Sequence, residues 1–255
     1  MTTARKVGEG GAAGGRREPA GGLAAVFLDG TYEDVEYYRR WALAADLVVA
    51  ADGGGRFLSA AGLVPDVLVG DFDSLGEAAV AEAAARGARV VRHSVRKDQT
   101  DGELAAEEAL RQGAGELVLA GALGALDHVL GHLALLAHVE ALGRPARLVS
   151  PELTVRVLRA PATVCLDAGP GARVSLAPVA GEAVVTLTGL EYALDHGRLP
   201  LDACLGLGNA VSAAADSEGH AAVIEVHEGC VAVLVYSGAE TFGGLRTPPA
   251  AVMDA

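Results

Sequence analysis

The stretch Val67-Leu68-Val69-Gly70-Asp71-Phe72-Asp73-Ser74 joins a short apolar run to a turn that carries two aspartates. The apolar run predicts a buried strand, so both carboxylates lie at its carboxyl end, where open α/β sheets bind ligands. Around a tight turn Asp71 and Asp73 can converge on one cation while Phe72 faces the core. The alternative is an aspartate-rich surface turn in which Ser74 caps the next helix.

Two further segments place similar side chains after apolar runs. Lys97-Asp98-Gln99-Thr100-Asp101 follows residues 90–91 after a short loop, and Gly121-Ala122-Leu123-Gly124-Ala125-Leu126-Asp127-His128 follows residues 117–120. If the runs form parallel strands, these segments meet at one edge of the sheet. Mg²⁺ prefers carboxylate and phosphate oxygens. The pattern therefore predicts a metal-dependent enzyme that acts on a nucleoside polyphosphate.

The second segment also has a purely structural interpretation. Thr100 and Glu103 form the pattern of a capping box, so a helix begins there, and Asp101 gains from the helix macrodipole. A helix N-terminus also attracts phosphate, which Asp101 would repel unless a cation lay between them. The combination with Lys97 favours Mg²⁺-ATP.

A glycine-rich turn, Asp52-Gly53-Gly54-Gly55, follows the apolar run 47–51. Glycine lets the backbone approach a ligand closely, although a plain strand-to-helix turn is an alternative. The turn lacks the Gly-x-x-x-x-Gly-Lys-Ser/Thr of a P-loop, so phosphate must be held differently. His128 and His132 are four residues apart but lack the glutamate of the His-Glu-x-x-His motif, which excludes that class of zinc enzyme.

Apolar runs alternate with helical segments as far as residue 150. Strands are expected at 23–28, 47–51, 67–69, 89–92, 116–120 and 147–149, and helices at 31–45 with Thr31 as N-cap, 56–61, 77–86, 100–113 and 127–142. This alternation predicts an α/β fold with a parallel sheet covered on both faces, a three-layer nucleotide-binding domain.

The pattern changes after Pro151. Short β-rich runs at 153–158, 163–166, 173–176, 183–187, 222–226 and 231–236 are separated by Gly, Pro and Asp turns, and segment 199–215 has no clear assignment. The pattern predicts a C-terminal antiparallel β-sandwich or barrel. The expected domains are 23–150 and 151–236, with disordered tails at 1–22 and 237–255.

Composition excludes several classes of partner. A net charge of -13 and 4% aromatic residues argue against binding to nucleic acid. The longest apolar stretches are too short to span a membrane. Three widely spaced cysteines without a Cys-x-x-Cys pattern, and a first segment unlike a signal peptide, predict a cytoplasmic location.

Four motifs together resemble, in order and spacing, the thiamine pyrophosphokinase (thiamine diphosphokinase) family. They are Ala51-Asp52-Gly53-Gly54, Gly70-Asp71-Phe72-Asp73-Ser74, Lys97-Asp98-Gln99-Thr100-Asp101 and Asp127-His128-Val129-Leu130. In addition, Gly189-Leu190-Glu191-Tyr192-Ala193-Leu194 resembles the family's Gly-Leu-x-Tyr/Trp-x-Leu segment, and Asn209 stands where the family has Ser-Asn. The resemblance covers about residues 23–236.

The resemblance implies a homodimer with active sites between subunits, which transfers the pyrophosphoryl group of ATP to the hydroxyl of thiamine and releases AMP. It implies that Asp71, Asp73 and Asp101 are catalytic and hold Mg²⁺, and Asp71 or Asp73 is a hypothetical proton acceptor. Tyr192 and Asn209 would lie near thiamine. The residues expected around the nucleotide and its phosphates are Asp52, Gly53, Gly54, Lys97, Gln99, Thr100 and Asp127.

Three positions depart from the family pattern. The family usually reads Gly-Gly-Arg-x-Asp-His where this chain has Gly124-Ala125-Leu126-Asp127-His128, so an arginine is missing. Gly208 replaces the usual serine, and Ala210 stands where glutamate is frequent. These departures leave two alternatives: a pyrophosphokinase for another alcohol such as a pterin, or a nucleotide- or thiamine-binding homologue with little turnover.

Overall fold

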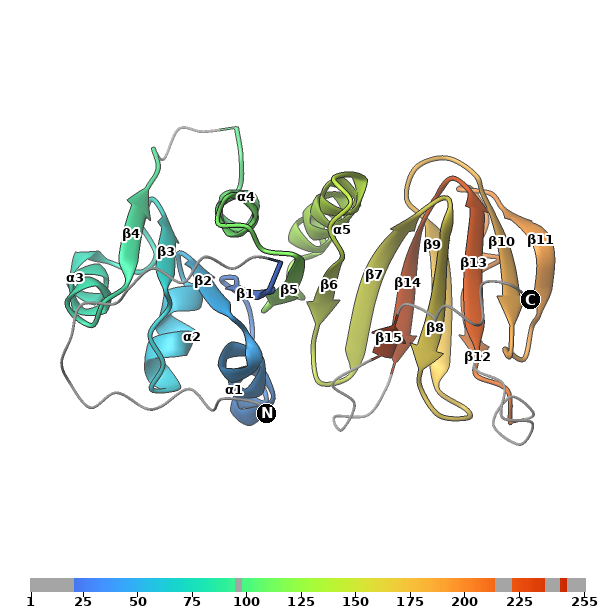
Figure 1. Ribbon diagram of the computed structural model, residues 1–255, viewed down its shortest axis with the longest axis horizontal. Helices are drawn as coiled ribbons and strands as arrows, with labels where there is room; N and C mark the ends of the chain where they lie inside the picture. Colours follow the sequence, from blue (N-terminus) through green and yellow to red (C-terminus); the bar gives the residue numbers. More distant parts are fainter. Residues whose placement is uncertain (1–20, 95–97, 214–221, 237–243, 247–255) are drawn as a thin grey trace. The chain divides into compact units, whose positions relative to one another are not determined.

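The computed structural model describes residues 21–94, 98–213, 222–236 and 244–246 (Figure 1). The chain forms two compact units, which divide between Gly124 and Ala125. The predicted tails lie almost entirely outside the described residues. Within the second of them the structure describes one short strand, β15 (Gly244–Arg246), which pairs with β8 (Ala162–Asp167).

The first unit contains a parallel sheet whose strands agree with those predicted. The sheet order is β5-β1-β2-β3-β4, and each neighbouring pair is parallel. All five carboxyl ends therefore lie at one edge. The strands are β1 (Leu23–Phe27), β2 (Leu47–Ala51), β3 (Val67–Gly70), β4 (Arg89–Arg92) and β5 (Glu116–Ala120).

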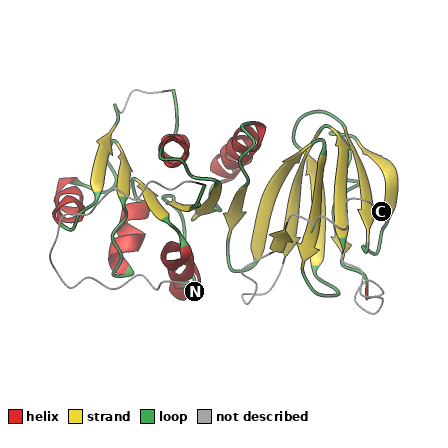
Figure 2. Ribbon diagram, viewed as in Figure 1, coloured by secondary structure: helices red, strands yellow, loops and turns green. Residues whose placement is uncertain are grey.

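Four helices accompany this sheet: α1 (Val35–Ala44), α2 (Gly54–Ala60), α3 (Glu77–Ala85) and α4 (Asp101–Arg111). In Figure 1, α4 lies on the opposite side of the sheet from α1 and α2. All five residues of β2 are buried, as expected for an apolar strand covered on both faces. Figure 2 shows the same mixture of helix and strand, so the fold of this unit is α/β as predicted.

Two predicted helix starts were wrong. The first helix is capped by Asp34, whose Oδ1 accepts a hydrogen bond from the Tyr37 N–H at 2.9 Å, and not by Thr31. Aspartate and threonine are both good caps, so composition alone did not separate the two positions. Helix α2 begins at Gly54, two residues before the predicted Arg56, because the glycine turn itself winds into the helix.

The second unit contains two antiparallel sheets. The first has the order β12-β9-β14-β7-β6, and the second has the order β11-β10-β13-β8-β15. Its remaining elements are α5 (Leu126–Ala141), β6 (Ala146–Val149), β7 (Leu153–Arg159), β9 (Arg173–Pro178), β10 (Ala183–Thr188), β11 (Leu194–Leu199), β12 (Asn209–Ala210), β13 (Val223–Glu228) and β14 (Cys230–Tyr236).

The two sheets share one core. Leu176 and Val233 of the first sheet are buried in the same apolar cluster as Leu187 and Ile224 of the second, which is the packing of a β-sandwich. Strand β11 was not predicted. Its sequence, Leu-Asp-His-Gly-Arg-Leu, is mostly polar and exposed, as is common for a strand at the edge of a sheet.

The division at residue 124 differs from the predicted boundary at residue 150, and the difference consists of α5 and β6. In the sequence they continue the alternation of strands and helices. In the structure α5 contacts β7, and β6 pairs with β7 through Leu148 opposite Val155. Both elements therefore complete the second unit.

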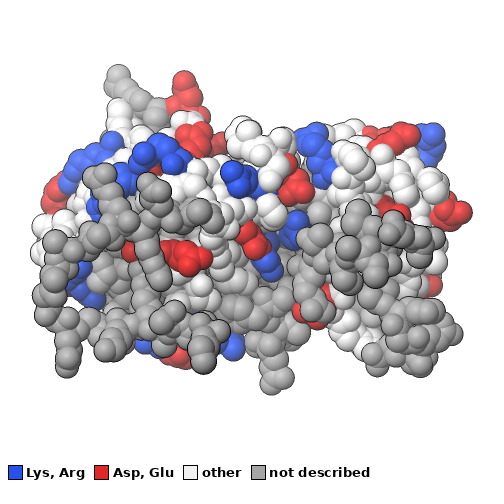
Figure 3. Space-filling view, in the orientation of Figure 1, with Lys and Arg blue, Asp and Glu red and all other residues white. Residues whose placement is uncertain are grey.

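Acidic and basic side chains are interspersed among the coloured residues of the face seen in Figure 3. Across the described ranges, no helix has both the length and the apolar character needed to cross a membrane.

Candidate functional site

Three aspartates from three elements gather at the carboxyl edge of the parallel sheet. Asp52 follows β2, Asp71 follows β3, and Asp101 is the first residue of α4. Each offers a carboxylate oxygen, and these oxygens lie within 4.8 Å of one another. Asp52 is buried and the other two are half-buried, so the group is open on one side.

Unusual backbone conformations shape this cluster. Asp52 and Phe72 have φ angles of 39° and 66°, in the left-handed region that residues other than glycine rarely adopt. The Phe72 side chain is buried, and the Arg92 guanidinium lies 5.0 Å from the centre of its ring. Such strain persists only where the surroundings impose it, and it is concentrated at functional sites.

The turn that follows Asp71 folds back over Asp52. The Ser74 side chain and the Leu75 backbone lie near enough to the Asp52 carboxylate to lower its pKa. The Asp73 N–H donates to Asp71 Oδ1 at 3.3 Å, and the Ser74 hydroxyl donates to Asp73 Oδ1 at 3.2 Å. The turn therefore ties Asp52 and Asp71 together through its backbone.

Burial raises the pKa of Asp52, and the charges of Asp101 and Asp73 raise it further, although Ser74 and Leu75 oppose the shift. Asp52 Oδ1 is buried and has no hydrogen-bond partner among the described residues. A buried, unpaired carboxylate oxygen beside two other carboxylates is unfavourable without a cation. The donor set fits Mg²⁺, which takes carboxylate oxygens and keeps open positions for phosphate.

Of the three aspartates that the sequence pointed to as metal ligands, Asp71 and Asp101 belong to this cluster. Asp73 does not: its side chain is exposed, and Asp52 takes the third place. Asp73 as a ligand therefore stays a prediction. Asp52 could have been recognised from the sheet order, because β2 and β3 are parallel neighbours and an aspartate directly follows each of them.

The glycines after Asp52 are required by packing inside the unit. A Cβ atom at Gly53 would lie 2.0 Å from Asp29 Oδ1, and one at Gly54 would lie 2.1 Å from the Phe27 carbonyl oxygen. These glycines let α2 approach the end of β1. Their expected contact with a nucleotide stays a prediction.

The start of α4 is fixed by the predicted capping box. Thr100 Oγ1 accepts from the Glu103 N–H at 3.2 Å, and the Thr100 N–H donates to Glu103 Oε2 at 2.7 Å. Both side chains of the box are thereby occupied, and Asp101 is held at the first position of the helix. Gln99 Nε2 donates to Glu107 Oε1 at 2.5 Å on the surface, and Lys97 lies outside the described residues.

In the second unit, Asn209 and Tyr192 are joined by hydrogen bonds. Asn209 is buried, accepts from the Tyr192 N–H at 3.0 Å and donates to the Tyr192 carbonyl at 2.8 Å. The Tyr192 side chain is 72% exposed. Asp127 is the second residue of α5, and its Oδ1 accepts from the His128 N–H at 2.9 Å.

Residues 38–147 match the family model described as the thiamin pyrophosphokinase catalytic domain. The resemblance to the thiamine pyrophosphokinase family is confirmed. The matched segment contains all three clustered aspartates, so the candidate metal site lies within the part of the chain that matches the family model.

Solved structures of the thiamine pyrophosphokinase family have the same fold. A thiamin pyrophosphokinase from Geobacillus thermodenitrificans is 26% identical with a TM-score of 0.69, over 86% of this chain and 99% of that one. A thiamine pyrophosphokinase from Bacillus subtilis is 22% identical with a TM-score of 0.72, over 84% and 99%. A thiamin pyrophosphokinase from Candida albicans is 14% identical with a TM-score of 0.70, over 85% and 90%. No curated protein matches the chain.

Proposed function

We propose that the protein is a Mg²⁺-dependent thiamine pyrophosphokinase, which transfers the pyrophosphoryl group of ATP to the hydroxyl of thiamine and forms thiamine diphosphate and AMP. The observation that carries the proposal is the cluster of Asp52, Asp71 and Asp101 within the matched catalytic domain. The names of the similar structures support thiamine as the acceptor.

Asp52 would form the buried wall of the metal site, and Asp71 and Asp101 would hold the metal from the open side. A bound Mg²⁺ would neutralise charge on the phosphate oxygens during the transfer. The start of α4, fixed by its capping box, presents backbone N–H groups that favour phosphate. Transfer of this kind depends mainly on positioning and charge neutralisation, which these elements supply.

The role of proton acceptor for the thiamine hydroxyl is proposed for Asp71 or Asp73. Asp73 lies next to the cluster without being part of it, and its exposed carboxylate can face an incoming substrate. Lys97, Gln99 and Asp127 are proposed to contact the phosphates, and Tyr192 with Asn209 to contact thiamine. A homodimer and a cytoplasmic location complete the proposal.

One observation favours a second candidate. Gly208 has a φ of +76°, and a Cβ atom there would meet nothing within 4 Å, so the place of the family's serine is open space next to Asn209. An acceptor of a different shape from thiamine, such as a pterin alcohol, is therefore the second candidate. A homologue that binds but turns over little is the third, because the arginine that the family has shortly before the Asp-His pair is missing from this chain.

The test is a mass balance with purified protein, Mg²⁺-ATP and thiamine. AMP and thiamine diphosphate formed in equal amounts, only when thiamine is present, support the proposal. AMP formed only with another alcohol supports the second candidate. Binding of thiamine or ATP, detected by calorimetry without formation of AMP, supports the third candidate. The Asp101→Asn variant is the matched control for contaminating activity.

A further inference from the structure

Arg56 joins two loops at the carboxyl edge of the parallel sheet. It is the third residue of α2, and its two terminal nitrogens contact different segments. Nη1 donates to the Ser74 carbonyl at 2.8 Å, and Nη2 pairs with Asp29 Oδ1 at 3.2 Å. The planar guanidinium is suited to this geometry, because its fork holds two acceptors at fixed positions.

The segment that Arg56 holds is the turn that shapes the candidate metal site. Ser74, whose carbonyl Arg56 contacts, also lies beside Asp52, because its side chain lowers the pKa of that carboxyl, and its hydroxyl donates to Asp73 Oδ1 at 3.2 Å. A Cβ atom at Gly55 would lie 3.2 Å from Leu75 Cδ2, so the turn rests directly on the start of α2. The Gly76 N–H closes the turn with a bond to the Phe72 carbonyl at 3.1 Å.

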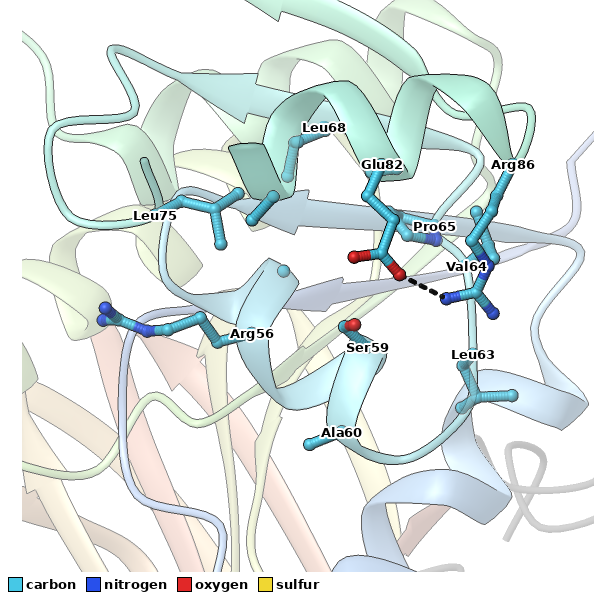
Figure 4. A pocket seen from close by; sticks show the side chains of 13 residues that line it. Arg56, Ser59, Ala60, Leu63, Val64, Pro65, Leu68, Leu75, Glu82 and Arg86 are labelled. Atoms are coloured by element: carbon cyan, nitrogen blue, oxygen red, sulfur yellow. Dashed lines mark ion pairs between the residues drawn. The ribbon is translucent and has the colours of Figure 1, made fainter. Parts of the chain in front are cut away.

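A pocket of about 300 Å³ lies beside the start of α2 and separates Arg56 from the ion pair of Glu82 and Arg86 (Figure 4). Arg56 stands at the end near Leu75 and points away from the pocket, whereas Glu82 and Arg86 pair at the other end, 3.7 Å apart. Arg86 touches neither the turn nor the cluster in the contacts described. The two arginines therefore form a matched pair for a test.

The Arg56 side chain is 54% exposed, and an ion pair with such exposure contributes little to stability. A contact that stabilises the fold only slightly can still decide where a ligand-bearing turn lies. Groups that orient metal ligands from outside commonly change metal affinity by about 10–100-fold when they are removed.

We propose that Arg56 is a positioning residue for the metal site, which clamps the 71–75 turn to Asp29 and so holds Asp71 and Ser74 in place against Asp52. The proposal rests on the proposed function, because it assumes that the aspartate cluster binds a divalent cation. It assigns no direct contact between Arg56 and the substrate.

The test measures Mn²⁺ binding by electron paramagnetic resonance, together with amide hydrogen exchange of residues 71–76, in the wild type and three variants. Arg56→Ala should weaken Mn²⁺ binding by about tenfold or more and speed exchange in the turn, with little change in thermal midpoint. Arg56→Lys keeps the positive charge but not the forked guanidinium, so its Mn²⁺ affinity should lie between those of the wild type and Arg56→Ala. Arg86→Ala should bind Mn²⁺ as the wild type does.

Unchanged Mn²⁺ affinity in Arg56→Ala would overturn the proposal, as would an equal loss in Arg86→Ala. A wild type that fails to bind Mn²⁺ would overturn it together with the metal site. A wild type that binds Mn²⁺ but forms no thiamine diphosphate contradicts only the proposed reaction. If thiamine diphosphate forms while Arg56→Ala keeps wild-type Mn²⁺ affinity, only the clamp is contradicted.

Discussion

Gly70 lies directly against Asp52 where β3 and β2 end. A Cβ atom at position 70 would lie 3.2 Å from Asp52 Cβ and 3.4 Å from Asp101 Oδ1, and the φ of Gly70 is +153°. Gly70→Ala should therefore combine backbone strain of about 1–3 kcal/mol with crowding of the cluster. We expect loss of Mn²⁺ binding by more than about tenfold, measured by titration, since even indirect perturbation of ligands costs this much.

Gly62→Ala is the matched control for this change. Gly62 has a φ of +75°, and its Cβ would meet nothing within 4 Å. The substitution should lower the free energy of unfolding by about 1–2 kcal/mol through left-handed strain alone. Mn²⁺ affinity should stay at the wild-type value, and an equal loss of affinity in both variants would contradict the assigned role of Gly70.

Substitutions can distinguish the roles of Asp52 and Asp73, because only Asp52 belongs to the cluster. Asp52→Asn should abolish Mn²⁺ binding and reduce kcat/KM by more than about a hundredfold. This loss exceeds the roughly 10–100-fold loss that follows when a residue that only supports the metal ligands is changed. Asp73→Asn should change Mn²⁺ affinity only slightly. If Asp73 accepts the thiamine proton, kcat should nevertheless fall with the KM for Mg²⁺-ATP unchanged.

The reverse result would restore the ligand set predicted from the sequence. Full metal binding in Asp52→Asn together with its loss in Asp73→Asn would show that the turn rearranges to bring Asp73 to the ion. The same titrations decide between the two sets without any assumption about the acceptor.

The raised pKa of Asp52 predicts how stability depends on pH in the metal-free protein. Below the ordinary aspartate value of 3.8, the carboxyl is protonated in both the folded and the unfolded chain, and it contributes no penalty. As pH rises from 3.8 to the raised pKa, the unfolded chain releases this proton more readily than the folded chain does, so the free energy of unfolding falls, and above the raised pKa it levels off. The Asp52→Asn variant should not lose this stability, because its side chain does not ionise.

Thermal midpoints of the wild type and Asp52→Asn in the presence of a chelator should therefore diverge as pH rises from below 4 toward neutrality, with the variant more stable. Adding Mg²⁺ should raise only the wild-type midpoint, since the ion stabilises the ionised carboxylates. A pH-independent difference between the two proteins would contradict the burial of an uncompensated charge at position 52.

The sequence predicted the parts of the fold that depend on local apolar pattern. The five strands of the first unit were found because each contains consecutive apolar residues, although β4 has only the two valines between its arginines. The start of α4 was found because Thr100 and Glu103 form a capping box. Strand β11 was missed because its stability comes from pairing with β10 and not from its own apolar residues. The place of α5 with the second unit likewise depends on packing against β7.

The candidate site was predictable only where it depends on local sequence patterns. Asp71 and Asp101 were identified from their positions after a strand and at a helix start. The presence of Asp52 in the cluster depends on the order of the strands and on a left-handed backbone at that residue. The role of Gly53 and Gly54 depends on how closely α2 approaches β1, which no local pattern reveals.

Asn209 offers a test that separates support of the proposed thiamine site from contact with thiamine. Its Oδ1 accepts from the backbone N–H groups of Tyr192 and Ala210 at 3.0 and 2.9 Å. Asn209→Ala leaves these groups without that acceptor, which should cost about 1–3 kcal/mol of unfolding free energy. It should also raise the KM for thiamine, because Tyr192 loses its support. Thermal unfolding and steady-state kinetics measure both effects.

Tyr192→Ala is the comparison that gives this result its meaning. The Tyr192 side chain is 72% exposed, so its removal should change the free energy of unfolding by less than about 0.5 kcal/mol. If Tyr192 contacts thiamine, the KM for thiamine should rise as in Asn209→Ala, with the KM for ATP unchanged in both variants. Because Asn209 acts through Tyr192 in this interpretation, the double variant should bind thiamine no worse than Tyr192→Ala alone. An additive loss would instead show that Asn209 contacts the substrate itself.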